Sequence, residues 1–97
     1  KKKFLDLNKY KIDQTFINWK GIAKLIIDKD TVIEIKNIKN INNLHVYSPP
    51  NENFFCIEPV TNIGNAYNIK KHSKIYQGLK LLKSGKKFEA KVEFRLI

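Results

Sequence analysis

The feature that most constrains the fold is a strict alternation of apolar and charged residues near the end of the chain. The apolar members of this run are Phe88, Ala90, Val92, Phe94 and Leu96, which alternate with Lys87, Glu89, Lys91, Glu93 and Arg95. Successive side chains of a β-strand point to opposite faces of the sheet, so a period of two predicts a strand with one apolar face. This is the clearest strand in the sequence.

The segments before it predict further strands, joined as hairpins. Leu79 to Leu82 precede a tight turn at Gly85, so we expect them to pair with the final strand. Two segments rich in β-branched residues, "GIAKLIID" and "TVIEIKNI", flank Lys29 and Asp30 and predict a second hairpin.

A third pair is predicted around two prolines. The segment "NLHVYS" ends at Pro49 and Pro50, which cannot continue a central strand, and "NFFCIE" begins after the polar turn at residues 51–53. No segment has a helical stripe with caps. We therefore expect residues 1–97 to form a single all-β domain, an antiparallel β-sandwich or part of one.

Composition restricts the classes of function. The net charge of +10 suggests a nucleic-acid partner, but nearly all of the positive charge is lysine and Arg95 is the sole arginine. Bidentate phosphate contacts and base recognition favour the planar fork of arginine. The lysines are also scattered between apolar positions, so the pattern favours a solvated face over nucleic-acid binding.

Other features concern the cellular context. The single cysteine, Cys56, lies among large apolar residues, so an internal disulfide is impossible and we expect a buried thiol. No apolar stretch approaches the length of a membrane span, and the N-terminal sequence lacks the apolar core of a signal peptide. We expect a cytoplasmic protein without a metal or cofactor. Because the sequence contains no methionine, we also expect it to be part of something longer.

Three ordered motifs run through the chain. They are "IDQTFINWKGIAKL", then "LHVYSPPNENFFCIEPVTNIGNAYN", then "QGLKLLKSGKKFEAKVEF". In this order they resemble the C-terminal part of the aldose 1-epimerases, the galactose mutarotase family. The resemblance covers nearly the whole chain and about the last third of the family fold. It implies that the chain forms the C-terminal part of a large two-sheet supersandwich.

The resemblance assigns a role to Glu58. Family enzymes interconvert the α and β anomers of a free sugar by opening the ring, which needs a general base and a general acid. Their base is the glutamate of the "EP" segment, and this position is Glu58 here. The apolar neighbours of Glu58 predict a partly desolvated carboxylate. Without the resemblance, a glutamate before a proline would read as a solvent-facing residue where a strand stops.

Asp13 is the second residue implied by the resemblance. It matches a family aspartate that accepts hydrogen bonds from sugar hydroxyls, a suitable task for an ionised carboxylate. The alternative is a turn-forming aspartate bonded to its own backbone. Trp19 could stack on a sugar, but a lone tryptophan in a small β domain is more often a packing anchor.

The two histidines do not match the family's catalytic histidines. His45 lies in an expected strand and is interpreted as a satisfied, structural residue, and His72 as a surface residue. The family's acid would come from strands before Lys1. We therefore expect no useful mutarotase activity from this polypeptide alone.

Three functions remain open from the sequence. The first is an aldose 1-epimerase fragment acting on a monosaccharide such as galactose or glucose. The second is a non-catalytic carbohydrate-binding module, and the third is a basic domain that binds polyanions. Cutting a large sandwich exposes strand edges and apolar faces, so we expect either a complementing N-terminal chain or self-association into a homo-oligomer.

Overall fold

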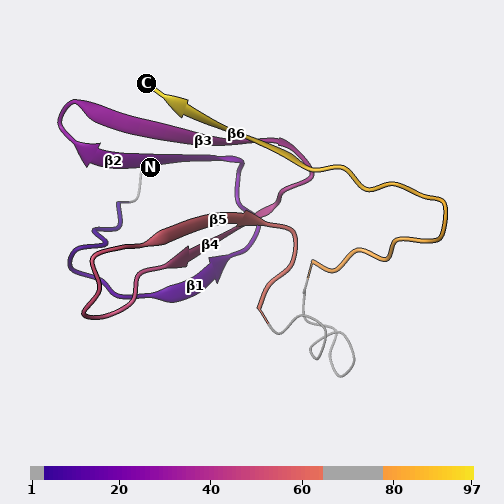
Figure 1. Cartoon of the computed structure of the whole chain (residues 1–97), viewed down its shortest axis with the longest axis horizontal. Helices are drawn as coiled ribbons and strands as arrows, with labels where there is room; N and C mark the ends of the chain where they lie inside the picture. Colours follow the sequence, from indigo (N-terminus) through magenta and orange to yellow (C-terminus); the bar gives the residue numbers. More distant parts are fainter. Residues whose placement is uncertain (1–3, 65–77) are drawn as a thin grey trace.

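The computed structural model describes residues 4–64 and 78–97, and these residues form six β-strands and no helix (Figure 1). The strands are β1 (Asp13–Phe16), β2 (Ile22–Asp28), β3 (Thr31–Lys39), β4 (Asn43–Tyr47), β5 (Cys56–Val60) and β6 (Lys91–Leu96). They build two antiparallel sheets, with strand orders β1-β4-β5 and β2-β3-β6. The fold is therefore an all-β antiparallel sandwich, as the alternating patterns predict.

The β1-β4-β5 sheet contains the pair of strands expected around the two prolines. β4 ends at Tyr47, just before Pro49, and pairs with β5 in the register Leu44↔Pro59 and Tyr47↔Cys56. β5 continues through Pro59 to Val60 and does not stop at the preceding glutamate. A proline can occupy this position because β5 is an edge strand, where the missing N–H costs no ladder hydrogen bond.

The β2-β3-β6 sheet contains the hairpin expected at Lys29 and Asp30. These two residues form the turn between β2 and β3, and the Asp28 carboxylate accepts a hydrogen bond from the Asp30 N–H at 2.8 Å. β3 is the central strand, with β2 on one side and β6 on the other. Figure 1 shows the long β2–β3 hairpin beside the C-terminal strand.

The expected pairing of Leu79–Leu82 with the final strand is wrong. Residues 79–82 are not in a strand, and β6 pairs with β3 in the register Ile35↔Phe94. The tight turn is present, because Gly85 has φ 79° and the Lys86 N–H donates to the Lys83 carbonyl at 3.0 Å. The nine-residue β3 offers a longer ladder and an alternating apolar face, which the short segment 79–82 does not.

The buried apolar side chains come from the central strand of each sheet and from the connection between them. Among the described residues they are Ile35 on β3, Leu44 and Val46 on β4, and Ile41 between these strands. On β4, alternation places Leu44 and Val46 on the face opposite to Asn43, His45 and Tyr47. The core thus uses one face of the β1-β4-β5 sheet, and the central strand presents Asn43, His45 and Tyr47 on the opposite face.

One glycine is required by close packing near this sheet. Gly78 has φ 71°, and a Cβ atom added there would lie 2.1 Å from the Thr61 carbonyl oxygen. The same carbonyl accepts a hydrogen bond from the Asn43 side chain at 2.9 Å. The chain after β5 and the chain at residue 78 therefore meet at one backbone position beside β4.

Candidate functional site

A row of three polar side chains crosses the β1-β4-β5 sheet. Thr15 on β1 is the register partner of His45 on β4, which is in turn the partner of Glu58 on β5. Directly paired residues of antiparallel strands project to the same face, with Cβ atoms about 5 Å apart. The row lies on the face opposite to the buried Leu44 and Val46, and we call this the polar face.

His45 is held by hydrogen bonds at both ring nitrogens. Its Nε2 lies 2.7 Å from Asp13 Oδ1, and its Nδ1 lies 2.7 Å from Thr15 Oγ1. Asp13 is two residues before Thr15 on β1, so it reaches His45 diagonally across the strand pair. The His45 side chain is 24% exposed and that of Asp13 is 69% exposed. Two side chains of β1 thus hold the imidazole of β4 at the surface of the sheet.

A cavity of about 320 Å³ lies over this row. Its lining consists of Thr15, His45, Glu58, Val60, Asn62, Ile63 and Gly64. The size is at the lower end of the range for small-ligand sites, and a few polar groups on an apolar background are typical of such sites. A hydroxylated ligand here would meet a carboxylate and a hydroxyl within one small space.

Asp13 lies in a strand, so its alternative interpretation as a turn-forming residue is wrong. It pairs with Tyr47 in the β1–β4 register, and its side chain bonds to His45 and not to its own backbone. Asp13 is not among the residues that line the cavity. It contributes to the site through His45, and its second carboxylate oxygen, Oδ2, is the one not engaged by that ring.

Glu58 lies on the polar face beside His45, but it is exposed. The prediction that the Glu58 carboxylate is partly desolvated by its apolar neighbours is therefore wrong. Alternation directs the apolar Ile57 to the other face, while Cys56 shares the face of Glu58. Cys56 is half-buried, less covered than its apolar neighbours predicted.

Of the other residues considered in the sequence, His45 is the one whose partners sequence reasoning missed. It is a satisfied strand residue as expected, but its link to Asp13 joins segments 32 positions apart. The available signal is the alternation of polar and apolar residues in the "NLHVY" of β4, which places His45 on the face opposite to Leu44 and Val46. Trp19 is half-buried, and its Nε1–H donates to the Ile22 carbonyl at 3.1 Å. His72 lies outside the described residues.

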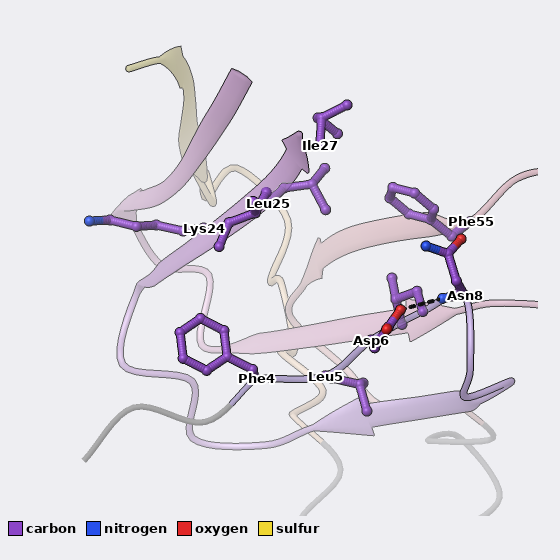
Figure 2. Close-up of a pocket in the computed structure, with 10 residues that line it drawn as sticks. Phe4, Leu5, Asp6, Asn8, Lys24, Leu25, Ile27 and Phe55 are labelled. Atoms are coloured by element: carbon purple, nitrogen blue, oxygen red, sulfur yellow. Dashed lines mark hydrogen bonds between the residues drawn. The ribbon is translucent and has the colours of Figure 1, made fainter. Parts of the chain in front are cut away.

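A second, larger groove of about 500 Å³ lies away from the polar face, between the N-terminal segment and β2 (Figure 2). Figure 2 shows Phe4, Leu25, Ile27 and Phe55 around it, while the ammonium end of Lys24 points away from Phe55. The hydrogen bond drawn there joins the Asn8 N–H to the Asp6 carboxylate at 2.9 Å. No set of polar groups converges in this groove, so it is a poorer candidate site.

Within residues 4–64 and 78–97, no group of three or more His, Cys, Asp or Glu side chains is arranged to hold a metal ion. In the same part of the chain there is no helix long and apolar enough to cross a membrane.

The Asp13–His45–Thr15 clamp beside Glu58 is the strongest candidate site of the described residues. It combines two carboxylates, an imidazole and a hydroxyl on one face of one sheet. Comparisons with models of protein families, with curated protein sequences and with solved structures find no match to this chain.

Proposed function

We propose that the polar face of the β1-β4-β5 sheet is a monosaccharide site of the aldose 1-epimerase type, with Glu58 as the base and Asp13 as a hydroxyl ligand. One observation carries the proposal: the two carboxylates singled out by the motifs flank the same histidine from opposite neighbouring strands. In the sequence they are separated by most of the described chain. Their meeting on one face supports a shared role.

The spacing of the two carboxylates suits a sugar ring. β1 and β5 are each adjacent to β4, so their backbones are separated by about 10 Å. Each ionised carboxylate accepts hydrogen bonds and donates none, which matches the hydroxyl groups around a pyranose. Glu58 lines the cavity and could take the proton of an anomeric hydroxyl there, whereas Asp13 Oδ2 could accept a second hydroxyl at the edge.

The proposal gives the chain a base without a free acid. Both nitrogens of His45 are engaged by Asp13 and Thr15, so the ring does not offer a proton to the cavity without breaking one of these bonds. Ring opening needs one proton delivered to the ring oxygen and another proton removed from the anomeric hydroxyl. We therefore expect sugar binding by this chain, with catalysis only when another polypeptide segment supplies the acid.

The test measures binding and catalysis separately. Galactose and glucose are titrated into the isotopically labelled protein and followed by NMR, and polarimetry follows freshly dissolved α-galactose and α-glucose. We expect saturable shifts at β5 and no acceleration of anomerisation. Glu58→Gln removes a charge-assisted hydrogen bond, so affinity should fall about 10- to 100-fold.

Glu52→Gln is the matched control, because Glu52 is an exposed glutamate in the preceding loop and outside the cavity lining. It should leave sugar binding unchanged. Absence of binding, or equal loss in both variants, would reject the sugar site. Anomerisation well above the spontaneous rate, lost in Glu58→Gln, would instead show that the chain is a complete enzyme.

The non-catalytic carbohydrate-binding module remains the second candidate, because it uses the same Asp13 and Glu58 as hydroxyl ligands. The polyanion-binding alternative is less well supported. Two carboxylates on the polar face would repel phosphate groups. The β2-β3-β6 sheet also presents charges of both signs on one face, namely Lys24, Glu34, Lys36, Glu93 and Arg95. A steep loss of polyanion affinity with salt, together with indifference to sugars, would favour this third function.

A further inference from the structure

The hydrogen bonds of His45 determine where its protons lie. An ionised Asp13 carboxylate can only accept, so the His45 nitrogen next to it, Nε2, must carry a hydrogen. In a neutral imidazole the other nitrogen, Nδ1, then has a lone pair and must accept. Thr15 Oγ1 lies 2.7 Å from Nδ1, so the threonine hydroxyl is the donor of that bond in the neutral state.

Protonation of His45 reverses this second bond without breaking it. In the imidazolium both nitrogens are donors, so Nδ1–H donates to Thr15 Oγ1. The bond from Nε2–H to Asp13 is unchanged. The hydroxyl hydrogen of Thr15 is then released from the ring and becomes available to another acceptor. Both states keep two ring hydrogen bonds.

We propose that His45 is a positioning residue: it holds one oxygen of Asp13 in place, and its protonation decides whether the Thr15 hydroxyl offers the cavity an acceptor or a donor. Thr15 lines the cavity together with His45 and Glu58, so a ligand meets this change directly. The consequence for sugars rests on the function proposed above. The reversal itself rests only on the two hydrogen bonds.

The groups that face His45 define the charge of the site. Asp13 approaches from β1, and Glu58 stands opposite on β5. The neighbouring row contributes Tyr47 on β4 and Cys56 on β5. A protonated His45 offsets one of the two carboxylate charges and turns Thr15 into a donor. A neutral His45 leaves Asp13, Glu58 and Thr15 as acceptors, so donor hydroxyls of a sugar should bind more tightly in that state.

Nitrogen NMR of the labelled imidazole tests the reversal directly. The neutral ring should be the Nε2–H tautomer, with the Nδ1 resonance displaced by the Thr15 hydroxyl. Thr15→Val, which keeps the shape of the side chain, should shift Nδ1 alone, and Thr15→Ser should restore the wild-type value. Thr31→Val, at the start of β3, is the matched control and should have no effect. An Nδ1–H tautomer, or an Nδ1 resonance unchanged in Thr15→Val, would overturn the proposal.

Galactose titrations at pH 5.5 and pH 8.0 then test the effect on a ligand. Affinity should rise about two- to tenfold at the higher pH, equivalent to about one hydrogen bond, and Thr15→Val should remove most of this difference while Thr15→Ser keeps it. A pH dependence that persists in Thr15→Val would contradict the role of Thr15. If no variant binds galactose but the nitrogen resonances behave as stated, the sugar site is rejected and the role of His45 stands.

Discussion

At the scale of single residues, Asn43 is the polar side chain that joins the polar face to the surrounding loops. It is fully buried, next but one to His45 on β4. Its Oδ1 accepts from the Asn18 N–H at 3.3 Å, and its Nδ2–H donates to the Thr61 carbonyl at 2.9 Å. Asn18 has φ 56°, a left-handed conformation that asparagine tolerates, so its N–H is directed by a tight bend after β1.

Replacing Asn43 with alanine should therefore destabilise the fold. The change removes the hydrogen bonds to the Asn18 N–H and to the Thr61 carbonyl from a fully buried position, at a cost of about 1–3 kcal/mol. Urea denaturation followed by circular dichroism measures the difference in the free energy of unfolding. Asn42→Ala is the control, since Asn42 is the exposed neighbour and uses its backbone carbonyl to accept from Trp19. Equal stability of both variants would mean that the Asn43 bonds contribute nothing.

At the scale of elements, β3 organises the second sheet. Its nine residues pair with β2 on one side and with β6 on the other, and Ile35 at its centre is only 2% exposed. Ala23 and Phe94 are the register partners of Ile35, so these three side chains share one face. The final strand had a predictable pattern, but its partner could not be read from that pattern. A strand pairs with the partner that gives a long hydrogen-bonded ladder and an apolar face on the same side of the sheet. The choice of partner therefore depends on residues far away in the sequence.

Ile35→Ala should thus cost far more stability than the same change elsewhere on the strand. Removal of a buried isoleucine side chain typically costs about 2–5 kcal/mol, from lost burial plus the cavity left behind. Ile38→Ala is the matched control, because Ile38 lies on the same strand and is 45% exposed. Thermal and urea unfolding of both variants measure the contrast. Similar losses for the two would show that the core does not centre on β3.

At the scale of the whole molecule, much apolar surface is uncovered. In the part of the chain that the structure describes, the four buried apolar residues are fewer than the exposed large ones. On β6, Phe94 is 56% exposed and Leu96 is 76% exposed, although both lie on the apolar face of their sheet. β1, β2, β5 and β6 are all edge strands in these two sheets. Open edges and bare apolar faces favour association.

We expect the protein to associate in solution, and Phe94→Lys with Leu96→Lys to shift it toward the monomer, because two lysines on this face disfavour its burial. Sedimentation velocity over a range of concentrations measures the change. Glu93→Lys is the control. Replacing a glutamate with a lysine raises the net charge by the same two units, and Glu93 lies on the same strand but on the opposite face of the sheet. A wild-type protein that stays monomeric at all concentrations, or a control that dissociates as well, would refute an interface on this face.

The sequence alone determined the strand character of the chain, the hairpin at Lys29 and Asp30, and the two carboxylates worth examining. The strand character and the hairpin depend on local periodicity and on turn residues, which operate over a few positions, whereas the two carboxylates were singled out by the resemblance of the ordered motifs. Only the tertiary structure decided that β6 pairs with β3, that Glu58 is exposed, and that Asp13 and Thr15 hold His45. The β3–β6 pairing and the hydrogen bonds of His45 join residues 30 or more positions apart, and no local pattern encodes them.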